Sequence, residues 1–179
     1  MLIGTEYGHL SASPQIAERE SAYLNQLAPI LEVDDVAIDV MAPDRHTLFA
    51  AAGAILSRHV PSTGRAVIAD ALEARERLAS TALGQGVAIP HGPIEGLAIT
   101  RAAVIRLREP LEFGAPDDAP VRLFVFLLVG ERASQHDLDT LVRIAEMLSD
   151  RAVRERLMLA PDARALHAAI ADWSSVHEG

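Results

Sequence analysis

The stretch LFVFLLV, Leu123 to Val129, is the longest uninterrupted apolar run in this chain. Its seven residues are too few to cross a membrane as a helix. A short apolar run that is rich in aromatic and β-branched residues is typical of a strand buried on both faces of a sheet. We therefore expect this run to be a buried strand with the rest of the chain packed around it.

Segments on both sides of this run predict further strands and helices. Val36–Val40 and Ala102–Leu107 are apolar runs with a β bias, and the Pro- and Asp-rich stretch Gly114–Pro120 leads into the central run. Apolar residues recur at helical spacing in five other segments. These are about 45–58, about 65–79 with Val67, Ile68, Ala71 and Leu72 inside, the stripe Leu138, Leu141, Ile144 and Leu148, a short helix with Val153 and Leu157, and a last one with Leu166, Ile170 and Trp173. The pattern predicts a single α/β sandwich.

The composition narrows the class of function. The chain has 179 residues, 50% of them hydrophobic and 23% charged, as expected for one globular domain. A net charge of −9 and only 4% aromatic residues argue against a nucleic-acid partner. With no Cys and only Arg among the sixteen basic residues, thiol and lysine chemistry are excluded. We expect a flexible extension at 1–20, a domain at 21–175, no membrane insertion and a cytoplasmic location.

His91 is the first candidate for chemistry among the seven histidines. It follows Pro90, which lacks an N–H donor and is expected to end the preceding strand. It precedes Gly92, which lets another molecule approach the backbone closely. A ring nitrogen presented there suits nucleophilic attack, although a loop histidine that merely follows a strand fits the local pattern as well. Solvated positions at helix surfaces or ends are expected for His46, His59 and His167.

Arg75 lies four residues after Ala71 and three after Leu72, on the helix face that we expect to be buried. A buried guanidinium needs an anionic partner. That partner is either a protein carboxylate or a bound phosphoryl group, and the pattern leaves both open. Ser80 and Thr81 follow at the end of this helix, where they either supply hydroxyl donors or simply end it.

Ser134 to Asp137 open the helix that follows the central run. Ser134 is a good N-cap, and Asp137 stands where the acid of a capping box would stand. Because the N-terminus of a helix attracts anions, a bound phosphate near it would be stabilised. His136 either neighbours such a site or is an exposed residue of the first turn.

On these residues the chain resembles a IIA domain of the phosphotransferase system, of the mannitol/fructose type (type 2), and in particular its nitrogen-regulatory branch. RERLASTALGQGVAIPHG, Arg75 to Gly92, is similar to the phosphorylation-site signature of that family. LEFGAPDDAPVRLFVFLLV, Leu111 to Val129, is similar to its later strand, Asp-containing loop and strand. The resemblance covers about Leu24 to Trp173. It implies an α/β fold with a central mixed β-sheet flanked by helices on both faces.

The resemblance also implies a regulatory phosphocarrier rather than an enzyme that turns over a small molecule. His91 would accept a phosphoryl group from a phosphorylated histidine carrier protein, and Arg75 would stabilise it. Phosphate-binding roles fall to Ser80, Thr81 and Gly92. Partners would be that upstream donor and regulatory target proteins, whose binding changes with phosphorylation state. No cofactor, metal or nucleotide is implied.

Two positions depart from the family pattern. Many relatives have a second active-site histidine where this chain has Asp137, with His136 one residue earlier. We carry both residues as candidates for the second position. Relatives also often have a basic residue after the PHG motif, where this chain has Pro93.

Other functions stay open at this point. One is a sugar-transport IIA subunit that passes phosphate from His91 to a cysteine of a IIB domain. Another is a IIA domain that binds partners without being phosphorylated. A third is a hydrolytic metal site built from His91, His136, Asp137 and Asp139. If His91 does carry phosphate, either ring nitrogen is a candidate.

Overall fold

A computed structural model describes residues 27–132 and 134–173 of the chain. The expected extension at 1–20 lies outside the described residues. The strands are β1 Val36–Val40, β2 Ala82–Gly84, β3 Val87–Ala88, β4 His91–Ile94, β5 Arg101–Leu111 and β6 Val121–Gly130. The helices are α2 Arg45–Leu56, α3 Arg65–Leu78, α4 Gln135–Ser149, α5 Arg151–Leu159 and α6 Ala163–Ala171, with 3-10 turns at Val33–Asp35 and Ser57–His59.

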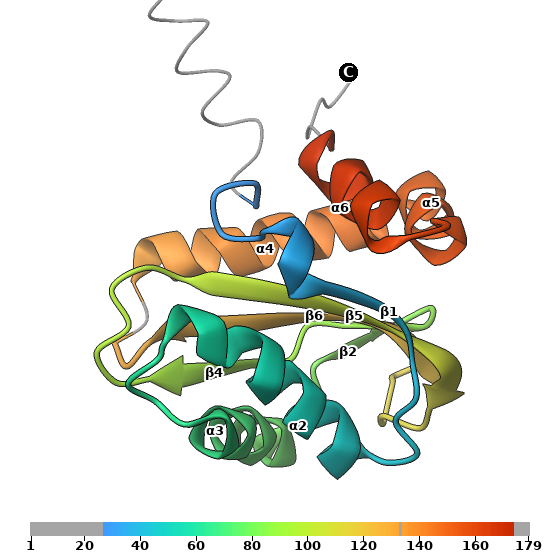
Figure 1. Ribbon diagram of the computed structural model, residues 1–179. Helices are drawn as coiled ribbons and strands as arrows, with labels where there is room; N and C mark the ends of the chain where they lie inside the picture. The colour runs from blue at the N-terminus through green and yellow to red at the C-terminus, as the bar shows by residue number, and fades with distance from the viewer. Residues whose placement is uncertain (1–26, 133, 174–179) are drawn as a thin grey trace, which may run out of the picture.

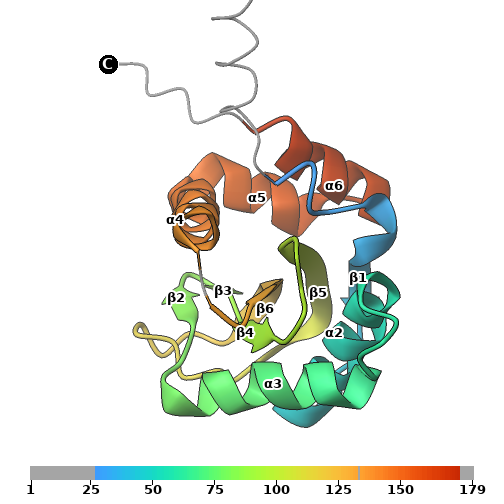
Figure 2. The same ribbon diagram turned by 90° about the vertical axis from the view of Figure 1, so that its left-hand side faces the viewer.

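These elements stack in layers with the sheet in the middle. Helices α2 and α3 cover one face of the sheet, and α4, α5 and α6 cover the other (Figures 1 and 2). The predicted fold class, a mixed sheet flanked by helices on both faces, is confirmed. Within the described residues, no helix is long and apolar enough to cross a membrane.

Strand β6 is the centre of the sheet. The strand order is β1-β5-β6-β3-β2, and β4 also pairs with β6. The pairing is antiparallel between β5 and β6 and between β2 and β3. It is parallel between β1 and β5, and between β6 and both β3 and β4. One strand therefore holds β5 on one edge and β3 and β4 on the other.

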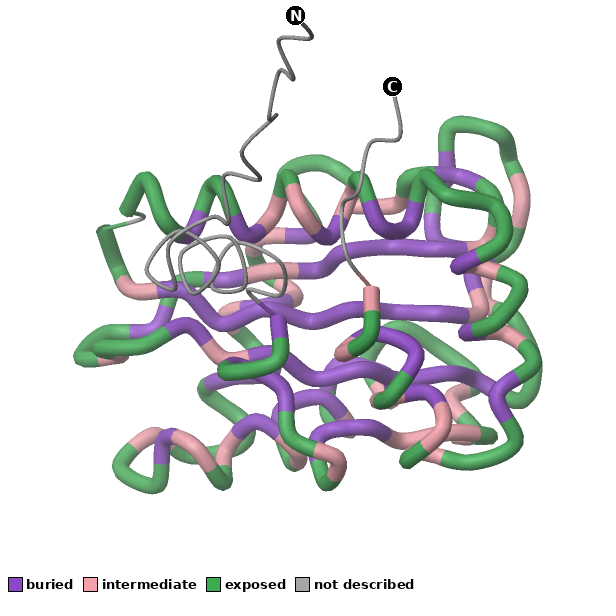
Figure 3. Tube along the Cα trace, turned by 90° about the horizontal axis from the view of Figure 1, so that it is seen from above, coloured by how far each residue is buried: buried purple, intermediate pink, exposed green. Residues whose placement is uncertain are grey.

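Both faces of β6 are buried, as predicted from its apolar run (Figure 3). Leu123, Val125 and Leu127 belong to the core under α4, α5 and α6. Phe124, Phe126 and Leu128 belong to the core over α2 and α3. The four Phe residues of the chain, completed by Phe49 and Phe113, all pack in that second core. The ring centroids of Phe113 and Phe124 are 5.0 Å apart, edge to face.

Two predicted inner faces are rotated from the observed ones. Val67 of α3 is 57% exposed and Leu138 of α4 is 49% exposed, so neither belongs to the core. The buried face of α4 begins instead with Asp137 and Thr140 and continues to Ile144. These polar side chains are buried at low cost because both are hydrogen-bonded. A pattern that counts only apolar residues misses such a face.

Arg106 of β5 attaches the outer helices to the sheet. Its side chain is buried, and Nη1 donates to the carbonyl oxygens of Leu157, Met158 and Ala160 at 2.8–3.0 Å. These carbonyls end α5, where the helix leaves its last acceptors without intrahelical donors. A cation at this end also suits the helix dipole.

Replacing Arg106 with Leu is therefore expected to lower the free energy of unfolding by about 2–4 kcal/mol, because three carbonyl acceptors, two of them in buried hydrogen bonds, lose their donor. Urea denaturation measures the change. Arg156 of the same helix is exposed, and R156L is the control, with an effect within about 0.5 kcal/mol. An R106L protein as stable as the wild type would contradict this account of how α5 is held.

Candidate functional site

His91 begins a strand instead of following the end of one. β3 stops at Ala88, the chain passes through Ile89 and Pro90, and β4 starts at His91. Both short strands lie along β6, and the carbonyl of Pro90 accepts the Leu127 N–H at 2.9 Å. The expectation that Pro90 ends the preceding strand is confirmed, but His91 opens a new strand and is not a loop residue beyond the old one. Ile89 and Pro90 lie outside the ladder, and pairing with β6 resumes at His91.

The register with β6 decides which way the His91 side chain points. His91 pairs with Leu127 and Gly92 pairs with Leu128. Paired residues of neighbouring strands share a face of the sheet. Leu127 belongs to the core under α4, and Leu128 to the core over α3. The His91 ring therefore lies on the α4 side of the sheet, half-buried, and Gly92 faces α3.

One nitrogen of the His91 ring is tied to the backbone. Nδ1 lies 3.0 Å from the carbonyl oxygen of Ile89. A carbonyl only accepts, so Nδ1 carries the hydrogen whenever this bond is formed, and Nε2 of the neutral ring keeps its lone pair. In the part of the chain that the structure describes, Nε2 has no hydrogen-bond partner. The ring is thus held in one orientation with a nucleophilic nitrogen free.

Gly92 is required for the packing of α3 against β4. A Cβ on Gly92 would lie 3.1 Å from the carbonyl oxygen of Ala71 and 3.2 Å from the Cα of Leu72. These distances are shorter than ordinary contacts, and both atoms belong to backbone that cannot swing away. Close packing against α3 is therefore one explanation for a glycine at this position, in addition to the predicted approach of a phosphate.

Arg75 is only half-buried, in contrast to the burial expected from its helix face. It follows Ala71 by one turn of α3, so it lies on the side of the helix that contacts β4. Its Nη1 donates to the Ala79 carbonyl at 3.2 Å. Among the described residues it forms no ion pair and no hydrogen bond with His91. No carboxylate of the described residues therefore neutralises the guanidinium charge.

The hydroxyl hydrogens of Ser80 and Thr81 are already donated within the protein. α3 ends at Leu78, and Ser80 Oγ donates to the carbonyl of Phe113 at 2.7 Å. Thr81 Oγ1 donates to Glu76 Oε2 at 2.5 Å, and the Thr81 N–H donates to Glu76 Oε1 at 2.9 Å. Sequence reasoning missed Glu76, because a carboxylate between Arg75 and Arg77 gives no sign that it is buried.

The capping box at the start of α4 is confirmed. Ser134 Oγ accepts the Asp137 N–H at 3.2 Å, and Asp137 Oδ2 accepts the Ser134 N–H at 2.7 Å. The other carboxylate oxygen of Asp137 accepts the Thr100 hydroxyl. Burial alone would raise the pKa of Asp137, but the hydrogen bonds from Thr100 and Ser134 outweigh it and lower this pKa.

His136 is exposed and lines a pocket of about 320 Å³ together with Thr100, Ser134 and Asp137. Within the described residues, neither His136 nor Asp137 forms a hydrogen bond or an ion pair with His91. The Asp137 carboxylate is occupied by its cap and by Thr100, which supplies a structural reason for an acid at this position.

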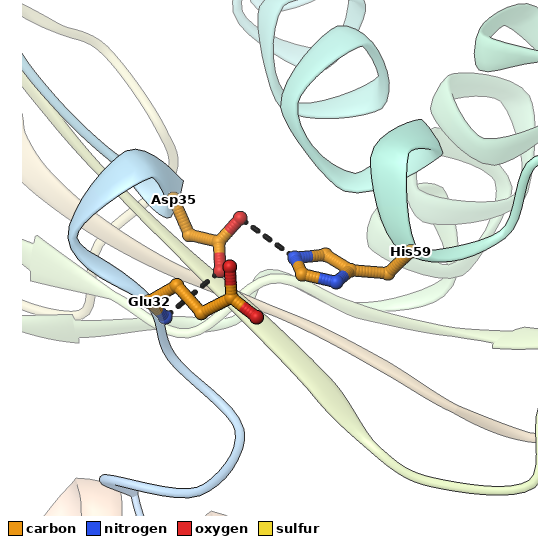
Figure 4. A group of neighbouring side chains, drawn as sticks. All are labelled: Glu32, Asp35 and His59. Atoms are coloured by element: carbon orange, nitrogen blue, oxygen red, sulfur yellow. Dashed lines mark hydrogen bonds and ion pairs between the residues drawn. The ribbon is translucent and has the colours of Figure 1, made fainter.

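His59 is not solvated as expected. Its Nε2 lies 2.8 Å from Oδ1 of the fully buried Asp35 (Figure 4). The same oxygen accepts from Arg58 at 2.6 Å, while Oδ2 accepts the Glu32 N–H at 2.9 Å. The buried charge of Asp35 is thereby paired and hydrogen-bonded, as burial requires. The contact joins residues 24 positions apart in the chain, which periodicity does not reveal.

Metal-ligating side chains converge at this same place. Of the described residues, Glu32, Asp35 and His59 form the group whose ligand atoms lie within 4.8 Å of one another. His91, His136, Asp137 and Asp139, considered above for a hydrolytic metal site, are not in it. Arg58 forms an ion pair with Asp35, and this pair links the two 3-10 turns. The ion pair therefore explains why these side chains lie together.

Comparison with known proteins shows the family to which this chain belongs. The family described as "Phosphoenolpyruvate-dependent sugar phosphotransferase system, EIIA 2" matches residues 29–173. The chain belongs to this family. The expected likeness to its nitrogen-regulatory branch is confirmed. A nitrogen regulatory protein of Pseudomonas aeruginosa is 42% identical over 118 residues, which are 66% of this chain and 77% of the relative. One from Escherichia coli K12 is 36% identical over 107 residues, 59% of this chain and 66% of the relative.

Solved structures agree with this membership. The crystal structure of nitrogen regulatory protein IIA-Ntr from Neisseria meningitidis has a TM-score of 0.76 at 40% identity, and the match covers 80% of this chain and 97% of that one. IIA mannitol from Escherichia coli shares the fold, with a TM-score of 0.64 at 22% identity over 79% and 99% of the two chains. The IIA domain is thus a phosphocarrier of the phosphotransferase type, which exchanges phosphoryl groups with other proteins of that system.

The lowered pKa of Asp137 in this IIA domain predicts a pH-dependent contribution to stability. Its folded-state pKa lies below the unfolded value of about 3.9, so the carboxylate stabilises the fold above that pH and ceases to do so as pH falls through the folded-state pKa. Asp137→Asn is expected to cost about 1–2 kcal/mol at neutral pH, and the two proteins converge in acid.

Urea denaturation across the acid range checks this prediction. Asp139 is exposed and its Oδ1 accepts from Gln135 Nε2, so D139N serves as the control and should leave stability and its pH dependence unchanged. A D137N protein that is destabilised equally at every pH would contradict the assignment to the ionised carboxylate.

Proposed function

We propose that this protein is a regulatory phosphocarrier of the nitrogen-type phosphotransferase system. It accepts a phosphoryl group on His91 from a phosphorylated histidine carrier protein and controls target proteins through its phosphorylation state. The observation that carries the proposal is the bond from Nδ1 of His91 to the Ile89 carbonyl, which leaves Nε2 as the nucleophile. We place the transfer in the cytoplasm, since phosphoenolpyruvate is an intracellular metabolite.

In the transfer step, the lone pair of Nε2 attacks the phosphorus of the donor's phosphohistidine. The new bond joins Nε2 to phosphorus, and the donor's phosphorus–nitrogen bond breaks with its electron pair returning to the donor ring. Positive charge develops on the His91 ring as it gives up electron density. The Ile89 carbonyl, 3.0 Å from Nδ1, stabilises that charge without moving. Neither a metal nor a nucleotide takes part.

Arg75 is the residue that we propose for the transferred group itself. The phosphoryl group spreads negative charge over its oxygens, which the fork of a guanidinium matches well. Within the described part of the chain, Arg75 is held by one neutral carbonyl, that of Ala79 at 3.2 Å, and by no carboxylate. It can exchange that bond for the phosphoryl oxygens by a change of side-chain rotamer. To bind the phosphoryl oxygens, Ser80 and Thr81 would exchange the hydrogen bonds that their hydroxyls now donate to Phe113 and Glu76. Gly92 would serve by its lack of a side chain.

A regulatory role is favoured over sugar transport by the relatives. The nitrogen regulatory protein of Pseudomonas aeruginosa is 42% identical, whereas a fructose-specific EIIA component of Haloferax volcanii is 31% identical over 103 residues. Phosphorylation adds nearly two negative charges and strong acceptors at a half-exposed ring. A surface changed in that way binds a target differently in its two states.

Intact-mass analysis after incubation with phosphoenolpyruvate and the upstream phosphotransferase proteins tests the acceptor. Wild type is expected to gain one acid-labile phosphoryl group, and His91→Ala none. His136→Ala, which removes an exposed ring from the start of α4, should still gain it. A His91→Ala protein that is phosphorylated as the wild type is would refute the assignment of His91.

Substituting Arg75 with Gln is expected to slow phosphorylation by on the order of ten- to a thousandfold while leaving the fold intact, because a cation that stabilises the transition state is lost. Stopped reactions analysed by mass give the initial rates. Arg77→Gln is the matched control, since Arg77 lies on the same helix but is exposed and pairs with Glu73 at 3.0 Å. Equal rates for R75Q and R77Q would exclude the proposed role.

A further inference from the structure

The carboxylate of Glu76 lies where a negative charge is unfavourable. It is 4% exposed and lies in the last turn of α3, where the helix dipole favours cations and burial of a charge is costly. Within the described residues it forms no ion pair. Its neighbour Arg77 pairs with Glu73 instead. A buried acid in such a position is explained by the groups that it holds.

Both oxygens of Glu76 hold Thr81, as described above. Thr81 lies between the end of α3 at Leu78 and the start of β2 at Ala82. One oxygen accepts the backbone N–H and the other accepts the hydroxyl. Two bonds to one residue fix both its position and the direction of its peptide group, which a single bond would not do.

Thr81 in turn holds the peptide that orients His91. The Thr81 carbonyl accepts the Ile89 N–H at 3.1 Å. The carbonyl of the same residue, Ile89, lies 3.0 Å from Nδ1 of His91. A continuous line of hydrogen bonds therefore runs from Glu76 through Thr81 and Ile89 to the His91 ring. A shift of Thr81 therefore displaces the acceptor that, among the residues that the structure describes, fixes the tautomer of the ring.

Helix α3 also grips this segment on the other side of Pro90. Gly92 packs against the backbone of Ala71 and Leu72, one turn before Glu76. Helix α3 thus contacts the segment on both sides of Ile89 and Pro90, through the packing at Gly92 and the hydrogen bonds to Thr81. Together they set the segment relative to one rigid element.

We propose that Glu76 is a positioning residue for phosphoryl acceptance by His91, acting through Thr81 and the Ile89 carbonyl. The proposal rests on the proposed function, since it takes His91 as the acceptor. If Glu76 served only to end α3, its loss would change stability alone. A positioning role makes the tautomer of His91 and the rate of transfer depend on Glu76.

The test uses the full chain with the substitutions E76A, T81V and T81S, and with E73A as the matched control. Glu73 lies on the same helix, but its carboxylate pairs with Arg77 and not with Thr81. One readout is the pair of ring-nitrogen chemical shifts of unphosphorylated His91, measured where imidazole is neutral. The other is the initial rate of phosphorylation by the phosphorylated histidine carrier protein.

For E76A we expect a loss of the single Nδ1–H tautomer and a rate lower by on the order of ten- to a hundredfold, because a misplaced reacting group costs that much. T81V, which keeps the N–H and removes the hydroxyl, should show a smaller change of the same kind. T81S and E73A should behave as the wild type does.

A folded E76A protein with wild-type ring shifts and rate would overturn the proposal. If E76A does not fold, T81V decides by the same two readouts, with wild-type values overturning the proposal and altered values supporting it. If the wild type accepts no phosphate while E76A still alters the ring shifts, the acceptor role of His91 fails and the positioning contact stands. The two failures are thereby distinguished.

Discussion

The structure depends on the burial of β6 on both faces. Side chains from Leu123 to Leu128 alternate between two cores and are at most 2% exposed, so the strand cannot slip by one residue without exchanging the two sets. Its edges hold β5 on one side and β3 and β4 on the other. The pairing of Leu127 with His91 then places the ring on the α4 side. A constraint deep in the core therefore determines which way a half-exposed side chain points.

At His91 a backbone group, and not a side chain, fixes the orientation of the ring. Pro90 has no N–H, so the ladder with β6 breaks there while its carbonyl still bonds to Leu127. The break leaves the Ile89 carbonyl free for Nδ1 of His91. Because the acceptor is the neutral main-chain carbonyl of the buried Ile89, the ring is oriented without adding negative charge beside the phosphoryl group that we propose it receives. Helix α3, which packs on the other face of the sheet, carries Arg75, the cation that we propose for the phosphoryl group.

The periodicity of apolar residues predicted much of this fold. It did not predict polar contacts between residues that are far apart in the sequence. The apolar run of β6, the helices near 45–58 and 65–79 and the capping box of α4 follow local rules and are confirmed. The exposure of Leu138, the burial of Glu76 and the pairing of His59 with Asp35 depend on partners brought together by folding. The neighbours Pro90 and Gly92 marked His91 as a candidate, but the hydrogen bond from its ring to the Ile89 carbonyl is visible only in the folded structure.

The most direct test of this account locates the phosphoryl group on the ring. Protein labelled with ¹⁵N in its histidines is phosphorylated through the upstream carriers, and long-range ¹H–¹⁵N spectra with phosphorus coupling are recorded. The account predicts phosphorus coupled to Nε2 of His91, with Nδ1 still protonated and bonded to the Ile89 carbonyl. Phosphorus on Nδ1 of His91, or on another ring such as that of His136, would contradict it.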